Sequence, residues 1–163
     1  SWGYHQRDFG WRPVEALLDN LIANASRNGN LQLNVGPMAD GSFPKAALRR
    51  LRQVGAWVAT NRETLWEAEP IDLPAPAGCY LMATELDAQT LRLYVHVRDW
   101  PADGELYLRG LGQNPMQAFE WETGRQLNYQ PDHEGIRLDL SHPAPDPSFS
   151  VLVVDVPKAA LEE

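Results

Sequence analysis

The stretch Gly29-Asn30-Leu31-Gln32-Leu33-Asn34-Val35-Gly36-Pro37 decides how the first half of the chain is read. Leu31, Leu33 and Val35 alternate with polar residues, so an extended backbone here has one aliphatic face and one amide-bearing face. Gly36-Pro37 ends the pattern, because proline has no backbone N–H and glycine adopts bends that other residues resist. We therefore predict a short β-strand over residues 30–36.

Helical patterns flank this strand on both sides. Pro13 suits the start of a helix, and apolar residues follow it at helical spacing as far as Ala25. After the strand, Pro44 precedes a second helix that we expect to end near Asn61, with its buried stripe formed by Ala47, Leu48, Leu51, Val54, Gly55 and Val58. Such a unit is an α/β segment. A strand with amides on its inner face, broken at its C-terminal end, is typical of the active-site rim of a (β/α) barrel, so we expect the last βα units of one.

The second half of the chain has the pattern of an all-β domain. Prolines at 70, 74 and 76 mark a boundary, so we expect one domain over residues 1–70 and another over 71–163. Short apolar or alternating runs then recur between turn signals such as Asp103-Gly104 and Glu134-Gly135: 79–83, 91–97, 105–108, 118–121, 136–140 and 149–156. This spacing predicts an antiparallel β-sandwich.

Composition excludes several kinds of partner. The 163 residues carry a formal net charge of −8, which argues against a nucleic-acid partner, since phosphate binding requires clustered Lys and Arg. No apolar run is long enough to cross a membrane, and the first residues do not resemble a signal peptide, so we expect a soluble chain and assign it no compartment. The sequence begins with Ser1 and not Met, which suggests a piece of a longer protein. Cys79 is expected to be a buried thiol, and with no Cys/His cluster at zinc spacing we predict no metal and no cofactor.

Residues 1–12 are rich in aromatic and polar side chains. Such a mixture is typical of the lining of a small-ligand pocket, although an N-terminal segment that packs its aromatics on a core has the same composition. His5, Asp8, Asp40 and Glu63 are the polar groups nearest to the expected strand ends. Asp8 and Asp40 occupy loops at the same end of the α/β unit and would be candidates for a carboxylate pair. Asp40, followed by Gly41, is more simply explained as a turn residue, and His5 and Asp8 are more simply explained as hydrogen-bonding groups of a loop.

These motifs resemble a known family. The resemblance rests on Ser1-Trp2-Gly3-Tyr4, on residues 29–41, on Gly55-Ala56-Trp57 and on Asn61-Arg62-Glu63, which occur in this order in the C-terminal part of family 29 α-L-fucosidases. The resemblance covers residues 1–70 by motif and residues 71–163 only by architecture. Members of that family combine a catalytic (β/α) barrel with a C-terminal β-sandwich, which agrees with the boundary near residue 70.

The resemblance implies hydrolysis of terminal α-L-fucosides with retention, a reaction that requires a nucleophilic carboxylate and an acid/base carboxyl group about 5–5.5 Å apart. In the family these groups come from barrel strands that precede the Trp-Gly-Tyr motif, so no catalytic residue of this chain is assigned by resemblance. Asp8, Asp40 and His5 remain only as candidates for substitutes. Trp2 resembles the aromatic residue that contacts the methyl edge of fucose, Tyr4 belongs to the same motif, and Asn34 resembles a residue that supports the rim of the pocket. We therefore expect Trp2, Tyr4 and Asn34 to bind substrate.

Partners follow from the same reasoning. Fucosylated glycans or α-L-fucosides are the expected ligands. A single strand between two helices leaves both of its edges unpaired, so we expect either a homo-oligomer or a missing N-terminal barrel segment. Two alternatives to this interpretation remain. In the first, the sandwich is a carbohydrate-binding module that uses the aromatic residues Trp100, Tyr107, Trp121 and Tyr129. In the second, the sandwich is an oligomerising appendage without a ligand.

Overall fold

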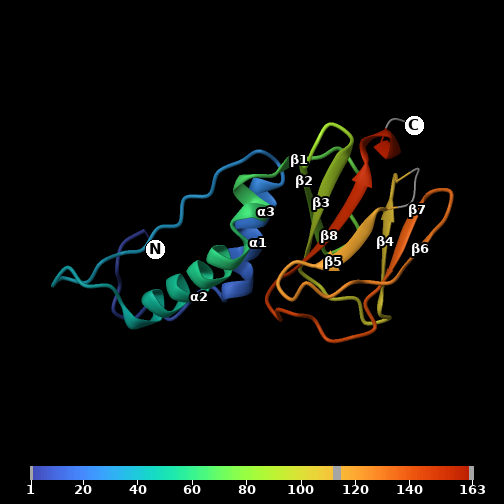
Figure 1. Ribbon diagram of the computed structural model, residues 1–163. Coiled ribbons are helices and arrows are strands. Elements are labelled where there is room, and N and C mark those ends of the chain that lie inside the picture. Colours follow the sequence, from blue (N-terminus) through green and yellow to red (C-terminus); the bar gives the residue numbers. More distant parts are fainter. Residues whose placement is uncertain (1, 112–114, 162–163) are drawn as a thin grey trace.

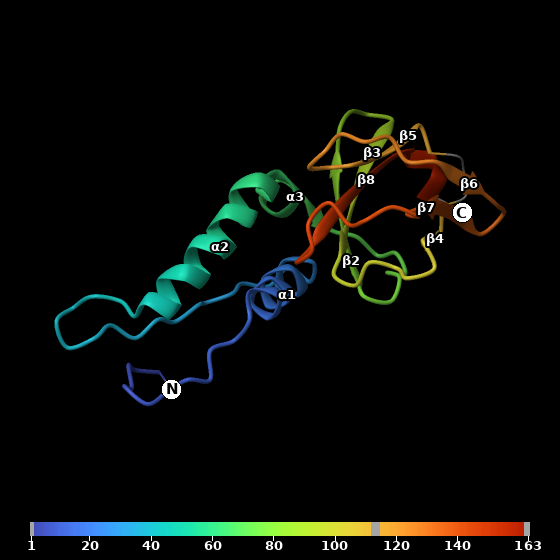
Figure 2. The same ribbon diagram turned by 90° about the horizontal axis from the view of Figure 1, so that it is seen from below.

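The computed structural model describes residues 2–111 and 115–161; Ser1, which opens the aromatic motif of the first segment, lies outside the described residues. Helices and long loops form one part of the molecule and two β-sheets form the other (Figure 1). Seen from below, residues 2–12 and the loop before the second helix lie at the end of the helical part that faces away from the sheets (Figure 2).

Three helices make up the helical part: α1 (Val14–Ala25), α2 (Lys45–Asn61) and α3 (Glu63–Trp66). Both predicted helices are confirmed. In α1 the predicted stripe provides the buried residues Leu18 and Ile22, whereas in α2 most of the predicted stripe is only half-buried and Gly55 is exposed. The large buried side chain of α2 is Trp57, which the stripe did not include. Among the described residues, no helix is long and apolar enough to cross a membrane.

The predicted strand over residues 30–36 is wrong. The segment contains no strand, and Leu31 and Leu33 are 38% and 40% exposed. A β-strand requires a neighbouring backbone for its ladder hydrogen bonds, and its alternation of apolar and polar residues does not supply one. The alternation of apolar and polar residues therefore did not suffice to predict a strand, because no backbone among the described residues pairs with this segment.

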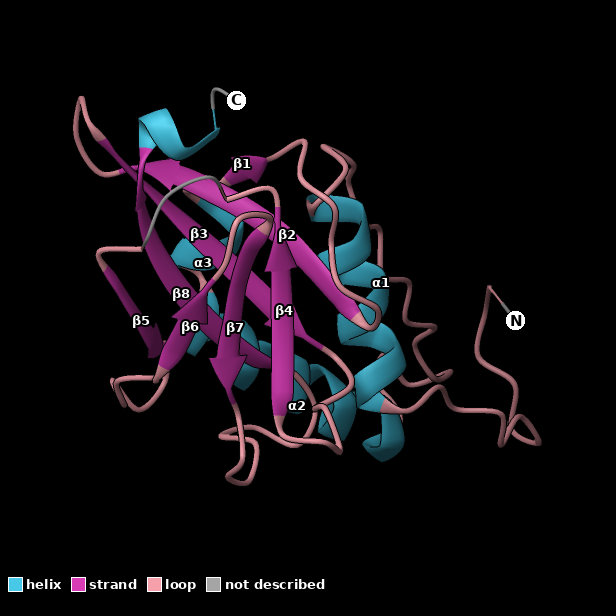
Figure 3. Cartoon of the chain, turned by 90° about the vertical axis from the view of Figure 1, so that its right-hand side faces the viewer, coloured by secondary structure: helices cyan, strands magenta, loops and turns pink. Residues whose placement is uncertain are grey.

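The predicted antiparallel β-sandwich is confirmed. One sheet has five strands in the order β1-β2-β3-β8-β5 and the other has three in the order β4-β7-β6, with every pairing antiparallel. Figure 3 shows the three-stranded sheet in front of the larger one, with the helices behind. The strands are β1 (Glu69–Pro70), β2 (Cys79–Glu85), β3 (Thr90–Val97), β4 (Glu105–Arg109), β5 (Gln117–Glu120), β6 (Tyr129–Pro131), β7 (Gly135–Asp139) and β8 (Ser150–Pro157), followed by a 3₁₀ turn at Lys158–Leu161. The short strands β1 and β6 were not predicted.

The five-stranded sheet is buried on both faces, which explains the composition of its central strands. On β8, Leu152 and Val154 face the smaller sheet and belong to the core of the sandwich, whereas Val151 and Val153 belong to a second core that includes Leu18 and Trp57 of the helices. A strand covered on both sides needs apolar residues on both of its faces, and the run Val151 to Val154 provides them. The helical part therefore packs directly on the sandwich.

Candidate functional site

A pocket of about 520 Å³ lies between residues 2–12, the extended segment 31–36 and the helices α1 and α2. Its lining includes the three expected substrate-binding residues Trp2, Tyr4 and Asn34, together with His5 and Asp8. Residues that are about thirty positions apart in the sequence thus share one concave site. Pockets of this size with aromatic walls and a few polar groups are typical small-ligand sites.

Two contacts join residues 2–12, the aromatic segment, to the extended segment 31–36. The Asn34 side-chain amide Nδ2 donates a hydrogen bond of 2.7 Å to the backbone carbonyl of Trp2. Gly36 lies against the backbone of Gly3 and Tyr4, so closely that a Cβ atom on Gly36 would be 2.3 Å from the Tyr4 backbone nitrogen. Trp2 itself lines the pocket and is 85% exposed.

His5 and Asp8 shape the loop that carries the aromatic residues. The Nδ1 atom of His5 accepts a hydrogen bond from the backbone N–H of Arg7, and Asp8 Oδ1 accepts one from the backbone N–H of Gly10 at 3.1 Å. The bond from Gly10 is the main reason that the pKa of Asp8 lies below its usual value. A carboxyl group that stays ionised is suited to charge stabilisation and unsuited to act as a general acid near neutral pH.

Asp40 is not part of the pocket lining. Its Oδ1 atom accepts hydrogen bonds from the hydroxyl and the backbone N–H of Ser42, at 2.7 and 3.0 Å, and the hydroxyl is the main cause of its lowered pKa. These are the bonds of a turn residue. Glu63 lies elsewhere, at the junction with the sandwich, where its Oε1 accepts a bond from the Tyr94 hydroxyl. Among the described residues that line the pocket, Asp8 is the one carboxylate, so Asp8 and Asp40 do not form a pair in it.

Arg50 is a site residue that sequence reasoning missed, because the helical pattern places it on an outward face. Its guanidinium lies 5.7 Å from the ring centroid of Trp11, and its Nε donates a 2.6 Å hydrogen bond to the carbonyl of Arg12. Arg50 also lines the pocket. It therefore holds the end of the aromatic segment against α2, and only the contact between distant segments reveals this.

A second cavity, of about 800 Å³, lies where the helices meet the loops of the sandwich. Glu122 and Asn61 line it, and neither carboxylate oxygen of Glu122 nor Oδ1 of Asn61 has a hydrogen-bond partner among the described residues. Burial raises the pKa of Glu122 to about 7, and the nearby carboxylates of Asp146 and Glu120 act in the same direction. Glu122 is therefore neutral in part of the population near pH 7.

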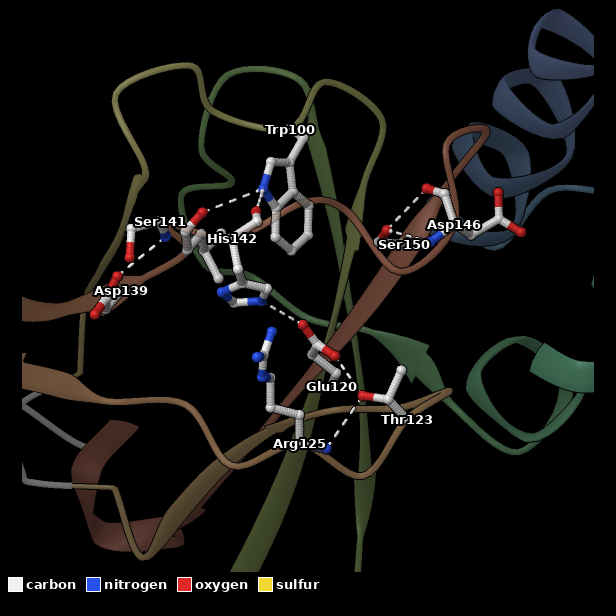
Figure 4. Close-up of polar contacts among 10 residues, drawn as sticks. Trp100, Glu120, Thr123, Arg125, Asp139, Ser141, His142, Asp146 and Ser150 are labelled. Carbon is white, nitrogen blue, oxygen red and sulfur yellow. Dashed lines mark hydrogen bonds and ion pairs between the residues drawn. The ribbon is translucent and has the colours of Figure 1, made fainter.

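Next to this cavity, a polar cluster connects the turn after β5 to the loop before β8 (Figure 4). The buried carboxylate of Glu120 contacts Nε2 of His142 and the hydroxyl of Thr123. The indole Nε1 of Trp100 donates to the carbonyls of Leu140 and His142. Every one of these groups bonds to another part of the same sandwich, so the cluster joins loops. Across the described residues, no group of three or more His, Cys, Asp or Glu side chains is arranged to hold a metal ion.

The four aromatics of the binding-module alternative are mostly packing residues. Trp100 and Tyr129 pack against the core between the sheets, and Trp121 packs against the core under the helices. Tyr107 lies on the outer side, where its hydroxyl donates to Asp132. They do not form one stacking surface for a sugar.

Comparison with known proteins agrees with the fold. Residues 1–63 match the family model described as alpha-L-fucosidase. The chain is 33% identical over 151 residues to the plasma alpha-L-fucosidase of Homo sapiens, and 33% identical over the same length to that of Pongo abelii. The structure of alpha-L-fucosidase isoenzyme 1 from Paenibacillus thiaminolyticus superposes with a TM-score of 0.83 at 26% identity, covering 94% of this chain and 37% of that one.

The proteins that this chain matches belong to one class, since they are all named as α-L-fucosidases. The chain is a relative of the α-L-fucosidases of glycoside hydrolase family 29, and the resemblance in the sequence is confirmed. The matched region covers 86% of this chain but only 31% of the human and orangutan relatives. The chain therefore spans about a third of the length of the relatives it matches.

Proposed function

We propose that this chain is the C-terminal portion of a retaining α-L-fucosidase acting on terminal α-L-fucosides of glycans. In this proposal residues 1–70 are the last βα units of the catalytic barrel and residues 71–163 are the C-terminal sandwich. The observation that carries it is the pocket that brings Trp2, Tyr4 and Asn34 together. An aromatic ring beside the apolar edge of a deoxysugar is favourable, because it buries the sugar's methyl group while leaving its hydroxyls free for polar contacts.

The nucleophile and the acid/base group are proposed to come from a segment outside this chain. Retention requires two carboxyl groups about 5–5.5 Å apart, and the described pocket lining contains only the carboxylate of Asp8. In this proposal residues 2–4 and 34–36 become neighbouring barrel segments; they already contact each other through the Asn34 side chain and the backbone of Gly36. Exposed Leu31, Leu33 and Phe9 belong to the surface that further barrel strands would cover.

Release of nitrophenol from nitrophenyl α-L-fucoside tests the proposal. Mass-verified chain, expressed in a host without α-L-fucosidase, is assayed over a thousandfold range of concentration. We expect no turnover while the chain is monomeric. Turnover per chain that rises with concentration would mean that copies assemble a barrel. Turnover that is independent of concentration would contradict the proposal, since it would place a complete catalytic pair within this chain, and Asp8→Asn and Asp40→Asn would then locate it.

A further inference from the structure

The two contacts between the extended segment and the aromatic segment point to a role for residues that do not themselves face the sugar. We propose that Asn34 and Gly36 are positioning residues, which fix the backbone of residues 2–4 and thereby set the aromatic wall of the pocket. The inference rests on the proposed function, because it concerns the same pocket. It goes further by assigning the position of Trp2 to two residues of a different segment.

The hydrogen bond from Asn34 defines one end of this arrangement. Its amide Nδ2 is 2.7 Å from the Trp2 carbonyl oxygen, and the residues it joins are 32 positions apart. A carbonyl that accepts a bond from a side chain cannot rotate without breaking it, so the peptide between Trp2 and Gly3 is oriented by Asn34. Asp at this position has nearly the same size and no N–H to donate.

Gly36 holds the other end of the contact between residues 2–4 and 34–36, because it has no side chain and so lets the two backbones approach each other. A Cβ atom there would lie 2.3 Å from the Tyr4 nitrogen, 2.6 Å from the Gly3 carbonyl carbon and 3.1 Å from the Gly3 Cα. All three are backbone atoms, so no rotamer change relieves the overlap. Any residue other than glycine must move residues 3–4 away from the extended segment.

The side chain of Trp2 depends on these contacts because it has little packing of its own. Trp2 is 85% exposed, so its position follows mainly from the backbone of residues 2–4. A shift of its ring by about 1 Å would remove the fit to a small sugar, since site geometry has to hold within a fraction of an ångström.

The test follows the indole N–H signal of Trp2 in a ¹⁵N-labelled full chain, assigned with Trp2→Phe. Gly36→Ala is compared with Gly55→Ala, an exposed glycine whose Cβ would meet nothing within 4 Å. Asn34→Asp is compared with Asn30→Asp, the same change at the exposed residue directly before the extended segment. We expect Gly36→Ala and Asn34→Asp to shift the Trp2 signal by more than its line width while the signals of Trp57 and Trp100 stay in place. Unchanged Trp2 signals in both variants would overturn the proposal.

Titration with L-fucose separates this inference from the proposed function. If the wild-type chain binds, we expect the Gly36→Ala and Asn34→Asp variants to bind at least tenfold more weakly and the two controls to bind as the wild type does; equal binding by all would overturn the positioning role. If the wild-type chain does not bind L-fucose, the sugar assignment for this chain fails, and the shift of the Trp2 signal alone still decides whether Asn34 and Gly36 position that residue.

Discussion

The indole Nε1 of Trp57, on α2, donates a hydrogen bond of 2.8 Å to the backbone carbonyl of Phe149, directly before β8. Both residues are buried, and their rings meet edge to face with centroids 6.3 Å apart. The bond joins residues 92 positions apart and ties the helical part to the sandwich. Removing it should therefore affect both parts together.

Trp57→Phe keeps most of the apolar contact and removes the donor. We expect it to lower the free energy of unfolding by roughly 1–3 kcal/mol, because the buried carbonyl of Phe149 is left without its partner. Urea unfolding followed by circular dichroism measures the loss. Trp66→Phe, at an exposed position, is the matched control and should change stability by less than about 0.5 kcal/mol. Equal effects of the two changes would show that the hydrogen bond contributes nothing.

The ion pair of Arg92 with Asp155 offers a second test. Arg92 donates to both carboxylate oxygens, at 2.7 and 2.8 Å, with side chains 16% and 3% exposed. Asp155→Asn leaves the arginine without its counter-charge, and we expect a loss of roughly 3 kcal/mol, the lower end for a buried pair. Glu105→Gln breaks the exposed pair with Arg137 and should cost less than about 1 kcal/mol. Chemical denaturation of both variants would contradict this view if it gave equal losses.

We predict that His96, the buried histidine of β3, makes the stability of the fold sensitive to acid. Burial lowers the pKa of His96 to about 3, from an ordinary value of 6.5. The folded chain thus takes up fewer protons than the unfolded chain between these values, so the stability that the neutral ring contributes is present above pH 6.5 and lost as the pH falls towards 3. His96→Gln should flatten this dependence, whereas His133→Gln, on an exposed side chain, should not. Melting temperatures from pH 3.5 to 7 measure it, and a wild-type slope in His96→Gln would refute the assignment.

For Glu122 we predict the opposite dependence of stability on pH. Its pKa is raised from 4.5 to about 7, so the folded chain binds the extra proton between these values, and stability is lost as the pH rises from 4.5 to 7. Glu122→Gln should remove that loss, with the exposed Glu134→Gln as control. Between pH 4.5 and 6.5 the effects of His96 and Glu122 on stability oppose each other. The Glu122→Gln variant keeps only the effect of His96, so we expect its stability to increase with pH. The His96→Gln variant keeps only the effect of Glu122, so we expect its stability to decrease with pH when unfolding is measured at several pH values. Parallel slopes in the two variants would contradict this.

Local patterns in the sequence predicted the longer helices and most of the strands. The period of 3.6 residues located α1 and α2, and the runs of alternating or continuous apolar residues located the main strands of the sandwich, because each pattern states which side of an element is buried. Two short strands escaped, since two or three residues carry no period. The motifs of residues 1–70 also identified the family. The resemblance predicted that Trp2, Tyr4 and Asn34 bind substrate, and the structure brings these three residues to the lining of one pocket.

Other features were decided only by tertiary structure, because they depend on which backbone lies beside which. Leu31, Leu33 and Val35 have the pattern of a strand, yet no ladder forms without neighbouring strands. The covering of β8 on both faces, the bond from Trp57 to Phe149 and the approach of Gly36 to residues 3–4 all join segments far apart in the chain. The sequence by itself determined what each segment prefers and which family it resembles. The tertiary structure decided which preferences were satisfied, since hydrogen bonds and burial are properties of pairs of segments and not of single ones.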